Sequence, residues 1–149
     1  MGKPNKVRKV HTYIAPVRFT HTDPAGYVFF PRFFEMFQAC VEDWFNNGLE
    51  VDYAKQILEY GVGLPTAHTD CDFLRPCKLG EQIEFSLSVE KVGNSSITII
   101  FIGRVEGEDR LHAKSVLVAI NTKDGKPVPI SDELRNKLKA YQLFSTERF

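Results

Sequence analysis

The sequence predicts an α+β fold in which an antiparallel β-sheet wraps around one long central α-helix. Residues 31–46 are apolar around most of the circumference of a helix, so other elements have to cover that helix on several sides. From residue 81 onward the chain alternates between polar and apolar side chains and is broken by hairpin turn signals. One long helix followed by hairpin-connected strands is typical of an antiparallel α+β domain. The 149 residues suffice for a single domain, residues 1–149, and are too few for two of typical size.

The first half of the chain predicts one strand and two helices. Residues 10–19 alternate and carry β-branched and aromatic side chains, which suits a first strand. In the long helix the polar positions recur at spacings of three and four and share one narrow stripe: Glu35, Gln38, Glu42 and Asn46. Asn47 and Gly48 are expected to end this helix through a left-handed cap. Residues 52–60 predict a short second helix, with a buried face made of Tyr53, Ile57 and Leu58.

The second half of the chain predicts strands. Residues 63–74 contain a proline and are therefore expected at an edge of the sheet or in an irregular strand. Residues 81–92 alternate cleanly, with four apolar side chains expected on one face: Ile83, Phe85, Leu87 and Val89. Residues 96–105 and 110–121 follow as two further strands, and Ser131 is expected to cap a terminal helix. The edges of the first and last strands are expected to be exposed, which favours association between subunits.

Composition and charge argue against several classes of function. The formal net charge is zero, so nothing indicates a nucleic-acid or anionic membrane partner. No apolar run reaches membrane-spanning length and the first residues lack the apolar core of a signal peptide, so we expect a cytoplasmic protein. The three cysteines, Cys40, Cys71 and Cys77, lack the spacing of a zinc site and are expected to be buried, reduced thiols. We therefore expect neither a metal nor a cofactor.

A carboxylate in a constrained loop lies between the first strand and the long helix. The loop reads Asp23-Pro24-Ala25-Gly26. Its proline keeps Asp23 out of the α region, and Gly26 can adopt a positive φ or let another group approach the backbone. Pro31 suits the first turn of the following helix, whose free N–H groups form a positive end suited to an anion or a polarised carbonyl. An Asp-Pro pair can equally be only a turn.

Residues 22–34 read Thr-Asp-Pro-Ala-Gly-x-Val-x-(aromatic)-Pro-x-(aromatic)-(aromatic). This run resembles the signature of the hotdog-fold acyl-CoA thioesterases, most closely the 4-hydroxybenzoyl-CoA thioesterase type. The resemblance implies a hotdog fold, hydrolysis of an acyl-CoA to a free acid and coenzyme A without cofactor or metal, and assembly into homodimers or homotetramers. Asp23 matches the catalytic carboxylate, which attacks the thioester carbonyl or deprotonates water. The backbone N–H of Phe30 matches the group that polarises the carbonyl.

The resemblance also implies a set of substrate-binding residues. Pro24 and Gly26 belong to the loop itself. Leu64 and Pro65 fall where the family lines its acyl site, although core packing would explain them equally well. Lys91 is the only basic residue where the family has several that contact coenzyme A phosphates, and it can equally be a solvated lysine.

The chain departs from the family at two positions. His21 stands where the family often has a second acidic residue; its imidazole would stabilise ionised Asp23, or it belongs only to the end of the strand. Phe30 stands where the benzoyl-type enzyme has a tyrosine. The hydroxyl that would orient a 4-hydroxybenzoyl group is therefore absent, and we expect an apolar acyl group instead.

Two other functions share this fold. A non-catalytic acyl-CoA or acyl-carrier binding module would keep the fold without turnover, but it has no need of a carboxylate beside an anionic ligand. A hotdog hydratase or dehydratase would carry a histidine-containing motif that we do not find in the sequence. A thioester hydrolase is therefore the function that the sequence predicts.

Overall fold

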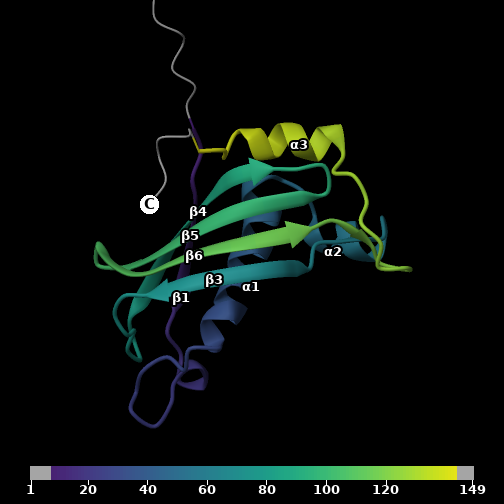
Figure 1. Ribbon diagram of the computed structural model, residues 1–149. Coiled ribbons are helices and arrows are strands. Elements are labelled where there is room, and N and C mark those ends of the chain that lie inside the picture. Colours follow the sequence, from purple (N-terminus) through teal and green to yellow (C-terminus); the bar gives the residue numbers. More distant parts are fainter. Residues whose placement is uncertain (1–7, 144–149) are drawn as a thin grey trace, which may run out of the picture.

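The fold is a five-stranded antiparallel sheet with the long helix packed against one face, as the sequence predicts (Figure 1). The computed structural model describes residues 8–143. Across the sheet the strands follow the order β1-β4-β5-β6-β3, and β2 and β7 form a separate pair. The strands are β1 His11–Pro16, β2 Val62–Gly63, β3 Thr66–Phe73, β4 Gln82–Val92, β5 Ser96–Val105, β6 Glu108–Val118 and β7 Ile120–Asn121. The α-helices are α1 Arg32–Asp43, α2 Tyr53–Leu58 and α3 Asp132–Lys139.

The core lies between α1 and the inner face of the sheet. Phe37 of α1 stacks on Phe101 of β5 with ring centroids 4.7 Å apart, and packs edge-to-face on Phe85 of β4 at 5.8 Å. The four apolar residues of β4 that were predicted to share a face are all fully buried: Ile83, Phe85, Leu87 and Val89. Burying each such side chain contributes about 1.5–3 kcal/mol, so β4 and α1 are central to the stability of the domain.

Helix α1 is covered less completely than its composition suggests. Its buried residues are Phe33, Met36, Phe37, Cys40 and Val41. The predicted polar stripe is exposed, as expected, but Phe34 is also 37% exposed. Part of the apolar circumference of this helix is therefore left uncovered by the described residues of a single chain.

The free edges of the sheet belong to β1 and β3. The prediction of an edge at the last strand was wrong, because β6 pairs with β5 on one side and with β3 on the other. The proline-containing segment does supply an edge strand, as predicted, and its register shifts between Thr66 and His68. Among the described residues β3 has a neighbouring strand only on its β6 side, so its outer edge presents unpaired backbone groups.

The first strand is shorter than predicted. It ends at Pro16 rather than at Phe19, and Phe19–His21 form a 3₁₀ turn. Proline has no N–H with which to continue the ladder. One more bond follows, from the N–H of Val17 to the carbonyl of Glu81 at 2.8 Å, after which the chain leaves the sheet. The alternating pattern continued to Phe19, but that side chain is 80% exposed.

The end of the long helix also differs from the prediction. Helix α1 passes into a π-helical turn, Trp44–Gly48, and the positive φ nearby, 56°, falls on Glu50 instead of Gly48. Position 48 requires glycine because there is no room for a side chain. A Cβ there would lie 2.8 Å from Cδ1 of Trp44 and 2.9 Å from the hydroxyl of Tyr141. The left-handed cap was therefore wrong.

The predicted buried face of the second helix is only partly correct. Tyr53 and Ile57 are half-buried, whereas Leu58 is 82% exposed. Leu58 is the last residue of a helix of only six residues, so too little helix follows to pack it against the domain. Leu58 was therefore wrongly assigned to the core.

The part of the chain from β6 to α3 largely follows the prediction. The predicted strand 110–121 is divided into β6 and the short β7, which pairs with β2. Ser131 caps α3, its Oγ accepting a hydrogen bond from the N–H of Leu134 at 3.2 Å. Within residues 8–143 no helix has the length and apolar character needed to cross a membrane.

Candidate active site

Residues 22–28 form a tight turn around Asp23, here called the Asp23 hairpin. Thr22 and Val28 pair as an antiparallel bridge. The N–H of Asp23 donates to the carbonyl of Tyr27 at 2.9 Å, and the N–H of Gly26 donates to the carbonyl of Asp23 at 3.0 Å. Gly26 has a φ of +83°, the first of the two possibilities that the sequence left open for this glycine. In Figure 1 this hairpin is part of the loop that projects below the sheet.

The carboxylate of Asp23 is held by its own loop through one oxygen. Its Oδ1 accepts a hydrogen bond from the N–H of Ala25 at 2.9 Å and a longer one from the N–H of Tyr27 at 3.4 Å. The side chain belongs to a half-buried residue, and none of the described residues donates to Oδ2. One oxygen thus orients the group while the other is available.

The start of α1 leaves one backbone N–H unused. The N–H groups from Arg32 to Phe34 donate to carbonyls three residues earlier, at distances from 2.8 to 3.2 Å. Pro31 has no N–H, and that of Phe30 forms no hydrogen bond to any of the residues 8–143. Phe30 is therefore the available donor at this helix end.

His21 lies two residues before Asp23 with one ring nitrogen already engaged. Its Nδ1 accepts a hydrogen bond from the N–H of Arg18 at 2.9 Å, which puts the proton of the neutral ring on Nε2. Burial lowers the pKa of His21; Glu35 opposes this shift, and Arg18 and Arg32 add to it. The imidazole is therefore uncharged at neutral pH and supports the turn that leads into the Asp23 hairpin.

Exposed phenylalanines surround the start of α1. Phe29, Phe30 and Phe73 are 49%, 58% and 46% exposed. Their rings form a continuous group: the centroids of Phe29 and Phe30 lie 5.8 Å apart, and those of Phe30 and Phe73 lie 6.3 Å apart. The group joins the helix end to the last residue of β3. Exposed aromatic rings grouped in this way are suited to contact an apolar ligand or partner.

The other predicted substrate-binding residues lie away from Asp23 within one chain. Pro65 directly precedes β3, and Phe73 lies at the other end of this strand. Because eight extended residues span about 25 Å, Pro65 lies about that far from Phe73. Leu64 beside it is buried in the core. Lys91 is exposed near the end of β4 that lies farther from the Asp23 hairpin. Pro24, Gly26 and Phe30 accompany Asp23, whereas Leu64, Pro65 and Lys91 do not.

The Asp23 hairpin rests on residues 77–79, here called the supporting segment. The N–H of Val28 donates to the carbonyl of Cys77 at 2.9 Å, and the N–H of Leu79 donates to the carbonyl of Gly26 at 3.0 Å. Between these bonds Tyr27 and Lys78 form an antiparallel bridge. The position of the hairpin therefore depends on the position of this segment.

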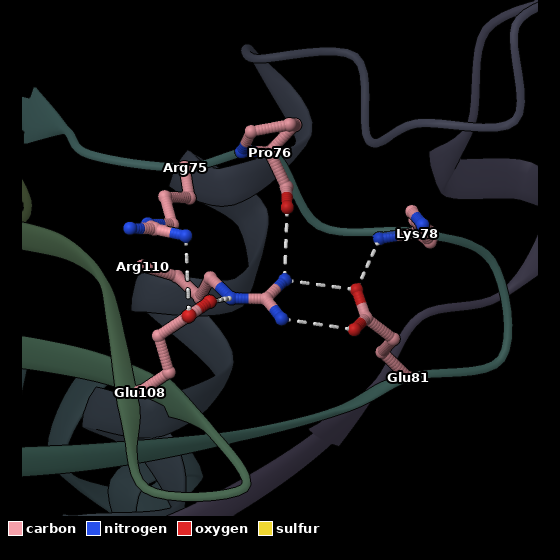
Figure 2. A network of polar contacts seen from close by, with 6 residues as sticks. All are labelled: Arg75, Pro76, Lys78, Glu81, Glu108 and Arg110. Atoms are coloured by element: carbon pink, nitrogen blue, oxygen red, sulfur yellow. Dashed lines mark hydrogen bonds and ion pairs between the residues drawn. The ribbon is translucent and has the colours of Figure 1, made fainter.

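An ion pair holds the supporting segment from the other side (Figure 2). Nη1 and Nη2 of Arg110 donate to the two carboxylate oxygens of Glu81 at 3.0 and 3.1 Å. The hydrogen bonds from Arg110 hold the pKa of Glu81 below its ordinary value. Sequence reasoning missed this pair, since its members are 29 residues apart and no local pattern connects them.

The three thiols are not suited to act as nucleophiles. Burial raises the pKa of Cys40 and of Cys77, and raises that of Cys71 to about 12. All three are therefore protonated at neutral pH. Cys40 and Cys77 are buried free thiols, as predicted, and Cys71 is half-buried. Among residues 8–143, three or more His, Cys, Asp or Glu side chains are nowhere grouped so as to hold a metal ion.

Comparison with known proteins identifies relatives. Residues 17–138 match the family model of the Thioesterase-like superfamily. A 1,4-dihydroxy-2-naphthoyl-CoA hydrolase of Acaryochloris marina (strain MBIC 11017) is 28% identical over 134 residues, which cover 88% of this chain and 97% of that protein. Another, from Prochlorococcus marinus (strain NATL1A), is 33% identical over 101 residues, 62% of this chain and 65% of that protein. The alignment thus spans just under two thirds of this second relative.

A solved structure shares the fold. The crystal structure of Slr0204, a 1,4-dihydroxy-2-naphthoyl-CoA thioesterase from Synechocystis, matches with a TM-score of 0.78 at 21% identity, covering 88% of this chain and 96% of that one. The match to the family model runs from the residues before the Asp23 hairpin to the last turn of α3. With its sheet packed around α1, the chain has the hotdog fold and belongs to the thioesterase-like superfamily.

Proposed function

We propose that this protein is an acyl-CoA thioesterase in which Asp23 is the reacting carboxylate. The observation that carries the proposal is the Asp23 hairpin, which fixes Oδ1 with loop N–H groups and leaves Oδ2 without a partner among the described residues. In the same loop, the unused N–H of Phe30 at the start of α1 is suited to stabilise negative charge on a carbonyl oxygen. Membership of the superfamily supports thioester hydrolysis as the reaction.

Two routes fit this arrangement. In the first, Oδ2 of Asp23 attacks the thioester carbon, the C–S bond breaks with coenzyme A leaving as a thiolate, and water hydrolyses the resulting mixed anhydride. In the second, Asp23 accepts a proton from a water molecule that attacks the same carbon, and the departing thiolate is protonated. In both, the N–H of Phe30 stabilises the oxyanion that forms when the carbonyl carbon is attacked.

We infer an aromatic acyl group that contacts the protein through its apolar ring. The exposed rings of Phe29, Phe30 and Phe73 offer such contacts, and Phe30 has no hydroxyl for a 4-hydroxybenzoyl group. The first compound to assay is 1,4-dihydroxy-2-naphthoyl-CoA, because the two curated relatives are named for its hydrolysis. Specificity constants that are higher for aliphatic than for aromatic acyl-CoAs would contradict this inference. A specificity constant that is highest for 4-hydroxybenzoyl-CoA would contradict the separate expectation, drawn from Phe30, that this compound is not the substrate.

We also propose that the active protein is a homodimer or a larger homo-oligomer. Pro65 and Lys91 lie too far from Asp23 to serve its site within one chain, so they could reach such a site only from a second copy, whereas Leu64 is buried in the core of its own chain. The free edge of β3, which ends at exposed Phe73, offers a place for that copy to join.

The experiment that tests the proposed function is a hydrolysis screen. Thiol release should be followed over a panel of short, long and aromatic acyl-CoAs, with and without a metal chelator. We expect turnover of at least one aromatic acyl-CoA, unchanged by the chelator because the chemistry needs no metal. Binding of acyl-CoA without turnover on any member of the panel would favour the acyl-binding module instead.

A further inference from the structure

The guanidinium of Arg110 donates hydrogen bonds to four oxygen atoms of three residues (Figure 2). In addition to both oxygens of Glu81, its Nη1 donates to the carbonyl of Pro76 at 2.8 Å and its Nε donates to Glu108 at 2.7 Å. Its side chain is only 13% exposed and that of Glu81 only 23%. A planar fork that binds a carboxylate through two nitrogens fixes direction as well as distance, which the point charge of a lysine does not.

These contacts hold one side of the supporting segment at two points of its backbone. Before Cys77, the carbonyl of Pro76 is bound by Arg110. After Cys77, the N–H of Lys78 donates to Glu81 Oε1, the same oxygen that Arg110 binds. The backbone of residues 76–78 is therefore tied to one ion pair at two points.

The opposite side of the supporting segment carries the Asp23 hairpin. Cys77 and Leu79 form the two backbone hydrogen bonds to Val28 and Gly26. Gly26 in turn donates to the carbonyl of Asp23. A continuous set of hydrogen bonds therefore leads from the guanidinium of Arg110 through the supporting segment to the backbone of Asp23.

We propose that the Arg110–Glu81 ion pair is a positioning device for Asp23, fixing the supporting segment on which the Asp23 hairpin is built. The inference rests on the proposed catalytic role of Asp23. Neither residue has to touch the substrate, so their effect is on the placement of the carboxylate against the thioester carbon. A displacement of about 1 Å at a reacting group can lower a rate roughly a hundredfold.

The main test is Arg110→Lys, which keeps the positive charge and loses the two-nitrogen fork. We expect kcat to fall by about ten- to a hundredfold, with KM changed less than about threefold, in assays well below the melting temperature of each variant. The matched control is Arg104→Lys. Arg104 lies on the same β5–β6 hairpin and donates to Asp109 and Ser86 instead, so its replacement should leave kcat unchanged.

Two further readouts separate positioning from a general structural role. Amide hydrogen exchange at Val28 and Leu79 should become faster in Arg110→Lys but not in Arg104→Lys, because those amides join the hairpin to the supporting segment. In an Asp23→Asn background, assayed at high enzyme concentration, Arg110→Lys should cause little additional loss of rate, since it acts through the carboxylate already removed.

The outcomes also distinguish this inference from the proposed function. Near-normal turnover of Asp23→Asn contradicts the proposed function. If Asp23→Asn disables the enzyme but Arg110→Lys has a near-normal kcat, only the positioning role is contradicted. A loss of rate in the Asp23→Asn/Arg110→Lys double variant that equals the product of the two single losses also contradicts the positioning role. If Arg110→Lys does not fold, Glu81→Gln replaces it: this variant keeps an oxygen for the N–H of Lys78, and an unchanged kcat would overturn the inference.

Discussion

The carboxylates of Glu81 and Asp23 differ in the hydrogen bonds that surround them. Both oxygens of Glu81 are bound by an arginine, so its charge is matched and its position is fixed. From the described residues, Asp23 receives only backbone N–H groups, all on Oδ1. The first arrangement suits a structural ion pair, and the second leaves an oxygen free to react.

The ion pair of Glu81 predicts a dependence of stability on pH. Hydrogen bonds from Arg110 lower the pKa of Glu81 below its ordinary value of 4.5 in the folded state. Its ionised form therefore stabilises the fold above that pH, and this contribution is lost as the pH falls through the lower folded value. In urea unfolding from neutral to acidic pH, wild type should be more stable than Glu81→Gln at neutral pH and lose that advantage in acid. A difference that stays constant with pH would contradict the assignment.

Gly48 gives a second prediction at the scale of single residues. A Cβ at this position would meet Trp44 and Tyr141 at 2.8 and 2.9 Å, in a part of the core that is already filled. Gly48→Ala should therefore lower the free energy of unfolding by about 1–3 kcal/mol. The control is Gly63→Ala, whose nearest contact would be an ordinary 3.4 Å and whose φ is not positive. Equal stability of the two variants in urea unfolding would show that Gly48 is not needed for space.

At the scale of elements, the sequence predicts those features that depend on neighbouring residues. The alternation in β4 identifies its buried face, and Gly26 of the Asp23 hairpin has the positive φ that was one of two possibilities for it. The order of the strands could not be predicted, because β3 pairs with β6 some 40 residues away in sequence, as in the pair Asp70 and Lys114. The Arg110–Glu81 pair was missed for the same reason. Leu58 was wrongly assigned to the core because the helical pattern of apolar residues continues to the end of α2, beyond the residues that pack against the domain.

Helix α3 offers a test of one predicted element. Ser131 Oγ accepts the N–H of Leu134, one of the donors that a helix leaves unpaired at its start. Ser131→Ala should reduce the free energy of unfolding by about 1 kcal/mol. Ser131→Asn, which retains an acceptor at the cap, should stay close to wild type. Chemical denaturation of the three proteins measures this, and an unchanged midpoint for Ser131→Ala would show that the cap adds little.

At the scale of the whole molecule, residues 8–143 of a single chain leave apolar surface and a sheet edge uncovered. Phe34, Phe73 and Leu74 are 37%, 46% and 49% exposed, and none of these described residues forms a strand on the outer side of β3. Soluble monomers rarely leave such surfaces open, which is the physical basis for proposing an oligomer. Sedimentation at micromolar concentration should show a dimer or larger, and specific activity should fall on dilution together with the sedimenting mass. A stable and fully active monomer would contradict the proposal.

The proposed reaction depends on the carboxylate of Asp23, and a single variant tests this role. Asp23→Asn keeps the size of the side chain and an oxygen for the N–H of Ala25, but removes the negative charge. With the best acyl-CoA of the panel, turnover should fall about a hundredfold to ten-thousandfold, because a general base or nucleophile is lost. The melting temperature and the affinity for coenzyme A should change little. Near-normal turnover together with a lowered melting temperature would make Asp23 a turn residue and contradict the account.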